Sequence, residues 1–536
     1  MNDTNDLPVM REDSAVVPPS GRELREWVLA VYRKQRLRQV SAELDLSLGG
    51  GRGKSHYIPP TLLDINAVDF RQSLQQQVFP VPRIVNEDLL EISKGKIMLE
   101  AGSGMGKTTF LKIYQEELLK GEPNSWFPLV VYFHLGRMPE GSGFSRFFEC
   151  VCKEILAVVL LERNENPELS LDELEITHVI ESLIEASSVL FLLDGFDQLQ
   201  PEDRFHVYHE VLVQGDALKS NFVILAGRPV QLGPFATNAV VRKGEEAAFR
   251  MSIQAVEERE RKAYLRSASN HDEIEKLQLH YPEMLTVPLL LKMIRDMSGP
   301  LEGVFTRTDL YTAYFRQLMQ KANHNSEQDW VDACFDRLAD ISFHWLTKGR
   351  SQRLEAAETG FPKEGTDGED AVFKEGGFLP ILNGILQQTP HRWEYCHPSF
   401  QEYFAARKLV FTGDWQGIVR SHCRDERWHE VFRFFAGLAP ELNSELFSIL
   451  LDEGALFAAG NCLSDAKGLS LDRRLLTEQF LKYQCKEKYP QFARFRLVDL
   501  NGISKACEAH YIKELIGRLL QRDKRDSRIL FGVFEL

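Results

Sequence analysis

Long hydrophobic segments are missing from this sequence. Its best apolar run, from Ile155 to Leu161, is far shorter than the roughly 20 residues that a membrane-spanning helix needs. Cysteine is also scarce: eight residues among 536, with no C-x-x-C pair, fit reduced thiols better than a disulfide framework. The start, from Met1 to Asp6, is acidic where a secretory signal would be basic and then apolar. We therefore expect a cytoplasmic protein with no membrane segment.

An excess of positive charge is absent as well. The formal net charge of −14 at pH 7 argues against a general polyanion binder, although local basic patches remain compatible with it. An apolar fraction of 43% and a charged fraction of 26% are typical of a soluble globular protein. No leucine-rich, ankyrin, WD40 or tetratricopeptide period is visible in residues 489–536, so we expect no repeat array there.

A glycine-rich stretch from Glu100 to Leu111, with the sequence EAGSGMGKTTFL, joins the end of a strand to the start of a helix. Gly95–Leu99 before it predicts a buried strand, and Thr108–Lys120 after it carries apolar residues at helical spacing. In a phosphate-binding loop, backbone N–H groups and a helix N-terminus surround the phosphate. We expect the nucleotide to be held by Gly102, Ser103, Gly104, Met105, Gly106, Lys107, Thr108 and Thr109.

Two residues of this loop have specific predicted roles. Lys107 reaches the β- and γ-phosphates, and the hydroxyl of Thr108 holds Mg²⁺. Ala101 stands where the motif has glycine, and a second stretch, Leu48–Ser55, misses the same glycine. Because Pro59-Pro60 follows that second stretch, no helix N-terminus can form there. We interpret it as a flexible basic linker.

Two further predicted strands end in polar residues. Ser188–Leu193 leads into Asp194, the pattern of a Walker B motif, whose carboxylate orients Mg²⁺ directly or through a water. Asn221–Ala226 ends near Arg228, which can approach the γ-phosphate and distinguish triphosphate from diphosphate. The alternation of strands and helices across residues 96–229 predicts a parallel, three-layer α/β domain.

A histidine lies at a second predicted strand-to-helix junction. Phe378–Gln388 and Arg392–Cys396 predict a hairpin, and Ser399 can cap the helix that follows. His397 lies between the two, where its imidazole can donate to a phosphate or serve a structural role. We expect no zinc site, because neither of two candidate groups shows a zinc spacing. One group is His206 and His209, and the other is Cys396, His397, His422, Cys423 and His429.

Four stretches of the sequence, in order, resemble motifs of the NACHT group of STAND NTPases, which includes NOD-like immune receptors and their bacterial relatives. The matching stretches are Asp194–Asp197, Ala226–Pro229, Thr286–Met293 and Tyr395–Ala406. The resemblance covers roughly residues 100–438 and implies a winged-helix domain and helical domains after the α/β domain. It also implies that Pro288 packs near the adenine and that His397 contacts the β-phosphate of ADP in a closed state.

The resemblance implies a slow ATPase that works as a switch. Gln198 stands where the family has Glu; it cannot act as a general base, although it can position water. Asp197 remains as a possible base or water-orienting carboxylate. ADP would hold the winged-helix domain on the nucleotide domain through His397. Exchange for ATP after an unknown phage or cellular trigger would open the protein and drive homo-oligomerisation, and Mg²⁺ is expected as the second cofactor. By family analogy alone, we expect a bacterial protein of anti-phage innate immunity.

The expected domains follow the chain from end to end. They are an N-terminal tail and basic helix (1–56), a connector with helical pieces up to about residue 86 (57–95), the nucleotide-binding domain (96–252), a first helical domain (253–322), the winged-helix domain (323–412), a second helical domain (413–488) and a small C-terminal module that is a possible sensor (489–536).

A basic segment precedes the nucleotide domain. Between Arg22 and Lys54, eight basic residues face four acidic ones, a local charge of +4, and a helix is expected from residue 20 or 21 to about Leu48. This helix either packs on the body of the protein or acts as an arm for nucleic acid, a membrane surface or self-association. The alternative function is therefore a STAND-type transcriptional regulator whose basic segment binds DNA, although the segment is short for a helix-turn-helix.

Overall fold

The computed structural model describes much of the chain between residues 22 and 466. The described ranges are 22–48, 57–58, 61–64, 78–80, 95–121, 128–138, 143–165, 172–186, 189–208, 211–212, 221–228, 249–266, 271–280, 282–297, 303–304, 306–322, 328–348, 353–355, 384–389, 392–453, 455–463 and 465–466. The expected tail, the basic linker and the C-terminal module lie outside them. Within these ranges, every helix is too short or too polar to cross a bilayer.

Five parallel strands form the centre of the α/β domain. They are β3 (Lys96–Glu100), β4 (Leu129–His134), β5 (Val189–Asp194), β6 (Phe222–Gly227) and β7 (Phe249–Ile253). Their order in the sheet is β7-β3-β6-β5-β4, and every neighbouring pair is parallel. β3 and β5 are buried along their whole length, as expected of strands covered on both faces. The prediction of a parallel α/β domain is confirmed.

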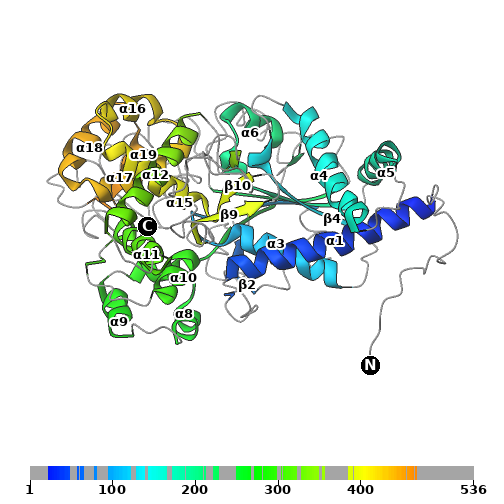
Figure 1. Ribbon diagram of the computed structural model, residues 1–536, viewed down its shortest axis with the longest axis horizontal. Helices are drawn as coiled ribbons and strands as arrows, with labels where there is room; N and C mark the ends of the chain where they lie inside the picture. Colours follow the sequence, from blue (N-terminus) through cyan, green and yellow to red (C-terminus); the bar gives the residue numbers. More distant parts are fainter. Residues whose placement is uncertain are drawn as a thin grey trace, which may run out of the picture.

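Helices cover both faces of this sheet (Figure 1). α3 (Lys107–Lys120) packs on one face, and α4 (Gly143–Glu165) and α5 (Glu173–Glu185) pack on the other. Side chains alternate along each strand, so that in β4 Val130 joins the core under α3 and Val131 joins the core under α4. The carboxyl ends of the parallel strands share one edge, and there the loop after β3 begins.

Two short strands extend the sheet beyond β7. β1 (Thr61–Asp64) pairs antiparallel with both β7 and β2 (Val78–Pro80). The expectation of helical pieces between residues 57 and 86 is therefore wrong at these positions, which belong to the sheet. Leu62 lies opposite Ile253, a residue distant in sequence. Local periodicity carries no signal for such pairing, because strand formation depends on the partner strand.

α1 (Arg22–Leu48) lies beside β4, the strand at the other edge of the sheet. Its predicted extent is confirmed. Val28 belongs to the core under α4, Val40 packs with α3, and the hydroxyl of Tyr32 donates to the carbonyl of Val130 in β4. An open strand edge invites pairing with another chain, and α1 covers this one.

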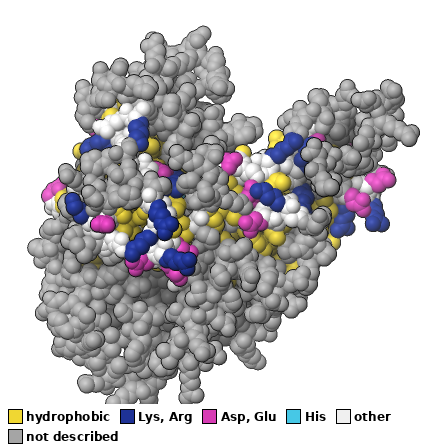
Figure 2. Space-filling view, turned by 90° about the horizontal axis from the view of Figure 1, so that it is seen from below, with side chains coloured by type: hydrophobic (Ala, Val, Ile, Leu, Met, Phe, Trp, Pro, Cys, Tyr) yellow, Lys and Arg dark blue, Asp and Glu magenta, His cyan; other side chains and the backbone are white. Residues whose placement is uncertain are grey.

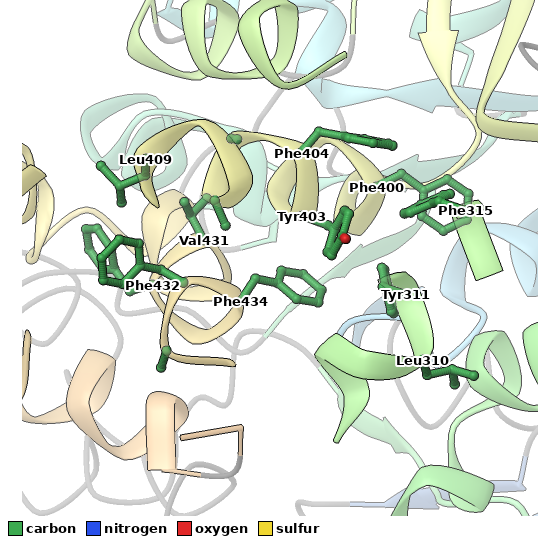
Figure 3. Packing of buried hydrophobic residues seen from close by; sticks show 14 of the residues in the cluster. Leu310, Tyr311, Phe315, Phe400, Tyr403, Phe404, Leu409, Val431, Phe432 and Phe434 are labelled. Atoms are coloured by element: carbon green, nitrogen blue, oxygen red, sulfur yellow. The ribbon is translucent and has the colours of Figure 1, made fainter. Parts of the chain in front are cut away.

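The described chain after β7 is mainly helical. It contains α8 (Glu258–Leu265), α9 (His271–His280), α10 (Pro288–Asp296), α11 (Arg307–Ala322), α12 (Gln328–Thr347), α15 (Pro398–Val410), α16 (Trp415–His422), α17 (His429–Leu438), α18 (Asn443–Asp452) and α19 (Leu456–Leu463). α11, α15 and α17 share an aromatic core in which Tyr311, Phe315, Tyr403 and Phe434 contact one another (Figure 3). We refer to this part as the helical half.

A small antiparallel sheet precedes α15. β10 (Arg392–Tyr395) pairs with both β9 (Leu386–Thr389) and β8 (Arg353–Glu355). The hairpin predicted before His397 is present as β9 and β10, and the first part of its predicted range lies outside the described residues.

Candidate functional site

The glycine-rich loop connects β3 to α3. Gly104 and Gly106 have positive φ angles of 77° and 87°, a region that L-residues with side chains rarely adopt. Gly106 is the N-cap of α3, so the first amides of the helix point into the loop. The ammonium of Lys107 donates to the carbonyl oxygens of Ala101 and Gly102, at 2.6 and 3.0 Å. The loop thus has two left-handed glycines and a helix N-terminus, the features on which a phosphate-binding loop depends.

Lys107 is the central charge of the site. Burial lowers its pKa to about 8, while the carboxylates of Asp197 and Asp194 oppose the shift and Arg228 adds to it. Burial disfavours the charged form of a lysine, and an adjacent anion favours it. A phosphate bound in this loop would therefore stabilise the ammonium form.

Asp194, at the carboxyl end of β5, lies beside Thr108. Its Oδ2 accepts from the hydroxyl of Thr108 at 2.5 Å and from that of Tyr132 at 3.0 Å, and its Oδ1 accepts from the amide of Gly195 at 2.9 Å. These oxygen donors suit Mg²⁺, which takes few protein ligands and completes its shell with phosphate and water. The sequence interpretation missed Tyr132, which lies in an apolar strand and resembles an ordinary core residue.

Asp197 and Arg228 form an ion pair across the ends of β5 and β6. The amide of Arg228 donates to Asp197 Oδ1 at 2.9 Å, and its guanidinium Nε lies 3.3 Å from Oδ2. Gly227 allows this approach, because a Cβ there would lie 2.9 Å from the Cβ of Phe196. Burial would raise the pKa of Asp197, but Arg228 and Lys107 outweigh it and lower the pKa.

Gln198 extends in a different direction from Asp197. Its Oε1 lies 2.7 Å from the position that a Cβ on Gly136 would take, and the ring of His134 borders the same glycine. The structure therefore places Asp197 next to Lys107 and Arg228, and Gln198 at the carboxyl end of β4.

The N-terminus of α10 contacts the glycine-rich loop. Pro288 occupies the first turn of α10, and the next amide, of Leu289, donates to the carbonyl of Gly104 at 3.1 Å. A Cβ on Gly104 would lie 3.0 Å from the Cβ of Leu289, so only glycine allows this approach. Pro288 is thereby held beside the loop.

His397 is the N-cap of α15. Its Nδ1 accepts from the amide of Ser399 at 3.1 Å. Burial and the cations Arg228, Arg307 and Lys107 lower the pKa of His397 well below its usual range. The imidazole is therefore neutral and lies among the positive charges of the site.

Three charged pairs of the helical half were not predicted. Arg228 Nη2 lies 2.7 Å from Glu402 Oε1 of α15, Arg307 of α11 pairs with Glu430 of α17, and Arg204 pairs with Glu426. Arg204 lies on α6 (Pro201–Tyr208), which follows the Asp194 strand. Glu402 could have been noted, since it lies within the Tyr395–Ala406 motif.

Arg307 also reaches the glycine-rich loop, with its Nη2 at 3.4 Å from the hydroxyl of Ser103. A lone arginine at the start of a helix gives no such signal in a sequence. Burial raises the pKa of Glu402 to about 7, against the pull of Arg228. Burial would also raise the pKa of Glu430, but Arg307 and Arg433 lower it to about 2.

The described histidines and cysteines do not form a metal site. Within the part of the chain that the structure describes, no three His, Cys, Asp or Glu side chains are grouped to hold a metal ion. His422 stacks on Trp428, and the Nε2 of His429 lies 3.2 Å from the carbonyl of Cys423.

The parallel sheet, the glycine-rich loop and the Thr108–Asp194 pair define a P-loop nucleotide-binding domain. Comparison with protein families agrees, because residues 96–272 match the NACHT domain. This region of the chain therefore matches the NACHT domain, which is a P-loop NTPase domain.

Two mouse proteins are similar over most of the chain. NACHT, LRR and PYD domains-containing protein 10 of Mus musculus is 23% identical over 469 residues, covering 80% of this chain and 62% of that protein. NLR family CARD domain-containing protein 4 of Mus musculus is 22% identical over 437 residues, covering 75% and 39%. The chain thus spans less than two thirds of the length of either relative.

Among solved structures, a Signal Transduction ATPase with Numerous Domains (STAND) protein with a tetratricopeptide repeat sensor, from Pyrococcus horikoshii, is 13% identical. The match covers 84% of this chain and 66% of that one with a TM-score of 0.33, which does not define a shared fold.

Proposed function

We propose that the chain is a nucleotide-controlled switch, closed with ADP and open with ATP. The observation that carries the proposal is the position of Arg228, which lies between Asp197 of its own domain and Glu402 of α15. Arginine binds phosphate and carboxylate with the same guanidinium donors. In the closed arrangement Glu402 engages donors that a γ-phosphate would need. ATP would compete with Glu402 and release α15.

The way in which the two halves meet supports a switch. The apolar core of the helical half includes no described residue between 95 and 228, and the cores of the sheet include none beyond Ile253. The halves are linked by charged and polar groups such as Arg228–Glu402, Arg204–Glu426 and Arg307–Ser103. Exchanging such a pair for phosphate or water costs far less than opening an apolar core.

The other residues take roles within this proposal. Lys107 and the amides of residues 102–109 bind the phosphates, and His397 donates to the β-phosphate of ADP. Pro288 packs near the adenine. Thr108 and Asp194 hold Mg²⁺, which supplies neutralisation of phosphate charge when it is bound.

The proposed hydrolysis is slow. Asp197, already paired with Arg228, is the candidate that orients the attacking water, and the cations Arg228, Lys107 and Arg204 lower its pKa, which makes it a weak base. Gln198 has no carboxylate to offer as a base and borders Gly136 instead. The chain would then report nucleotide state rather than turn over rapidly.

We further propose that residues 323–412 form a winged-helix domain, built here from α12, the β8-β10-β9 sheet and α15. The biological setting that we propose, by family analogy alone, is innate immunity against phage or other viruses, with homo-oligomers in the ATP state. Both mouse relatives carry NACHT or NLR in their names, which agrees with the NACHT resemblance.

A transcriptional regulator is the second candidate, and the packing of α1 disfavours it. Lys34 pairs with Glu162 of α4, and Arg36 donates to Gln115 of α3 and pairs with Glu43. On the described surface seen in Figure 2, Lys and Arg side chains lie interspersed with Asp and Glu rather than in one basic patch. Salt-sensitive binding of residues 1–60 to duplex DNA would favour this candidate.

The proposal is tested by Glu402→Gln, which keeps the shape of the side chain and removes the charge that engages Arg228. We expect ADP release, followed with a fluorescent ADP analogue, to accelerate about tenfold, and ATP to produce larger assemblies at lower concentration. Glu441→Gln, the same change at an exposed position, is the control. A release rate equal to that of the control would contradict the proposal.

A further inference from the structure

A continuous series of hydrogen bonds runs from the glycine-rich loop to His397. Arg307 Nη2 lies 3.4 Å from the hydroxyl of Ser103 and 3.4 Å from that of Tyr311. The Tyr311 hydroxyl lies 2.6 Å from Ser399 Oγ, which in turn lies 2.6 Å from His397 Nδ1. The series links the P-loop, α11 and the start of α15.

The chemistry of its two ends sets the direction of every bond. A guanidinium can only donate, so Tyr311 must accept from Arg307. At the other end the backbone amide of Ser399 donates to His397 Nδ1, so this nitrogen carries a lone pair. Tyr311 therefore donates to Ser399, Ser399 donates to Nδ1, and the ring proton lies on Nε2.

The surroundings hold this arrangement in place. Tyr311 and Ser399 are fully buried, where an unmade hydrogen bond is costly. Arg307 is held by Glu430 and lies over the rings of Tyr311 and Phe434 at 5.3 and 4.9 Å. The guanidinium therefore cannot turn away without breaking its ion pair and both ring contacts.

We propose that Arg307, Tyr311 and Ser399 are positioning residues that hold His397 as its Nε2–H tautomer and join it to Ser103 of the phosphate loop. His397 thereby presents a hydrogen-bond donor, and never a lone pair, to an anion. When a phosphate displaces the Ser103 hydroxyl, the change in the hydrogen bond to Arg307 would be passed along the same series to the N-terminus of α15. The part of this proposal that concerns nucleotide rests on the proposed function; the tautomer does not.

The tautomer is measured on full-length protein, free of nucleotide, with ¹⁵N-labelled histidine. Long-range ¹⁵N–¹H correlation spectra distinguish Nε2–H from Nδ1–H, and loss of a signal in His397→Gln identifies the residue. We expect His397 to be wholly Nε2–H in the unmodified protein. Tyr311→Phe lets the Ser399 hydroxyl turn and accept, and Ser399→Ala removes this hydroxyl, so that only the longer 3.1 Å bond from the Ser399 amide holds Nδ1. In both variants we therefore expect a tautomer mixture or an exchange-broadened signal. Tyr314→Phe, a buried tyrosine of α11 outside the series, is the control.

A pure Nε2–H signal in both Tyr311→Phe and Ser399→Ala would overturn the proposal, as would an Nδ1–H signal in the unmodified protein. Tyr311→Phe keeps the buried ring, so its folding can be verified by an unchanged circular dichroism spectrum.

ADP affinity separates this proposal from the proposed function. Tyr311→Phe is expected to weaken ADP about fivefold and ATP less, whereas Tyr314→Phe is expected to change neither. An altered tautomer with unchanged ADP affinity would support the positioning role and overturn the nucleotide contact of His397. An unaltered tautomer with weakened ADP would leave that contact in place and overturn the positioning role.

Discussion

Two helices contact the NACHT domain in opposite ways. α1 shares apolar cores with it: Val28 packs under α4 and Val40 packs against α3. α15 belongs to a separate core and meets the domain through Glu402 and Arg228, a buried ion pair at the carboxyl end of the sheet. Apolar packing has no substitute partner in solution, whereas a carboxylate on an arginine can be replaced by phosphate. We therefore expect α1 to stay bound to the domain, and the proposed switch requires only α15 to separate from it.

The largest effect is expected where the contact is permanent. Val28→Asp places a charge at a fully buried position, so we expect the free energy of unfolding to fall by about 3 kcal/mol or more. Urea unfolding followed by circular dichroism measures it. Ala42→Asp, on an exposed face of the same helix, is the control. If the free energy of unfolding falls by the same small amount in both variants, α1 is not held by its apolar core, and the difference between α1 and α15 is contradicted.

A smaller effect is expected from Lys107→Ala, which tests the phosphate binding on which the proposed release of α15 depends. ADP at about 100 times its Kd should stabilise the unmodified protein by roughly 2.7 kcal/mol, and the variant should lose this gain. Thermal melts with and without ADP measure it. Lys120→Ala, on the same helix with about half of its side chain exposed, should keep the gain. Equal stabilisation in Lys107→Ala would remove the phosphate role of this lysine.

The smallest effect concerns acid. Burial would raise the pKa of Glu43, but Lys112 and Arg36 lower it from 4.5 to about 2. A lowered carboxyl pKa stabilises the fold above pH 4.5, and this contribution is lost as the pH falls toward 2. Since 35% of the Glu43 side chain is exposed, screening by solvent reduces this contribution to the free energy of unfolding to about 1 kcal/mol. Urea titrations between pH 5 and about pH 2 measure the free energy of unfolding of the unmodified protein and of Glu43→Gln, which should lack this pH-dependent loss. The same pH dependence in both proteins would contradict the prediction.

The part of the site that could be predicted is the part whose signal is local. A glycine-rich loop between a strand and a helix, and an apolar strand that ends in Asp194, are visible in a few consecutive residues. Glu402 lies within a motif, but its partner Arg228 is far away in sequence, so the motif does not reveal the pair. Arg307 acts through Ser103, which is also distant in sequence, and no spacing marks it. β1 was missed for the same reason, since its conformation depends on β7.

The carbonyl of Val130 in the edge strand β4 accepts from both Tyr32 and Gln115, which engages its two lone pairs. A strand from a second molecule would have to displace these donors and the whole of α1 to extend the sheet on this side. Growth by strand addition, the route to cross-β fibres, is therefore blocked at this edge. A second copy that meets this edge would contact the surface of α1 rather than the strand.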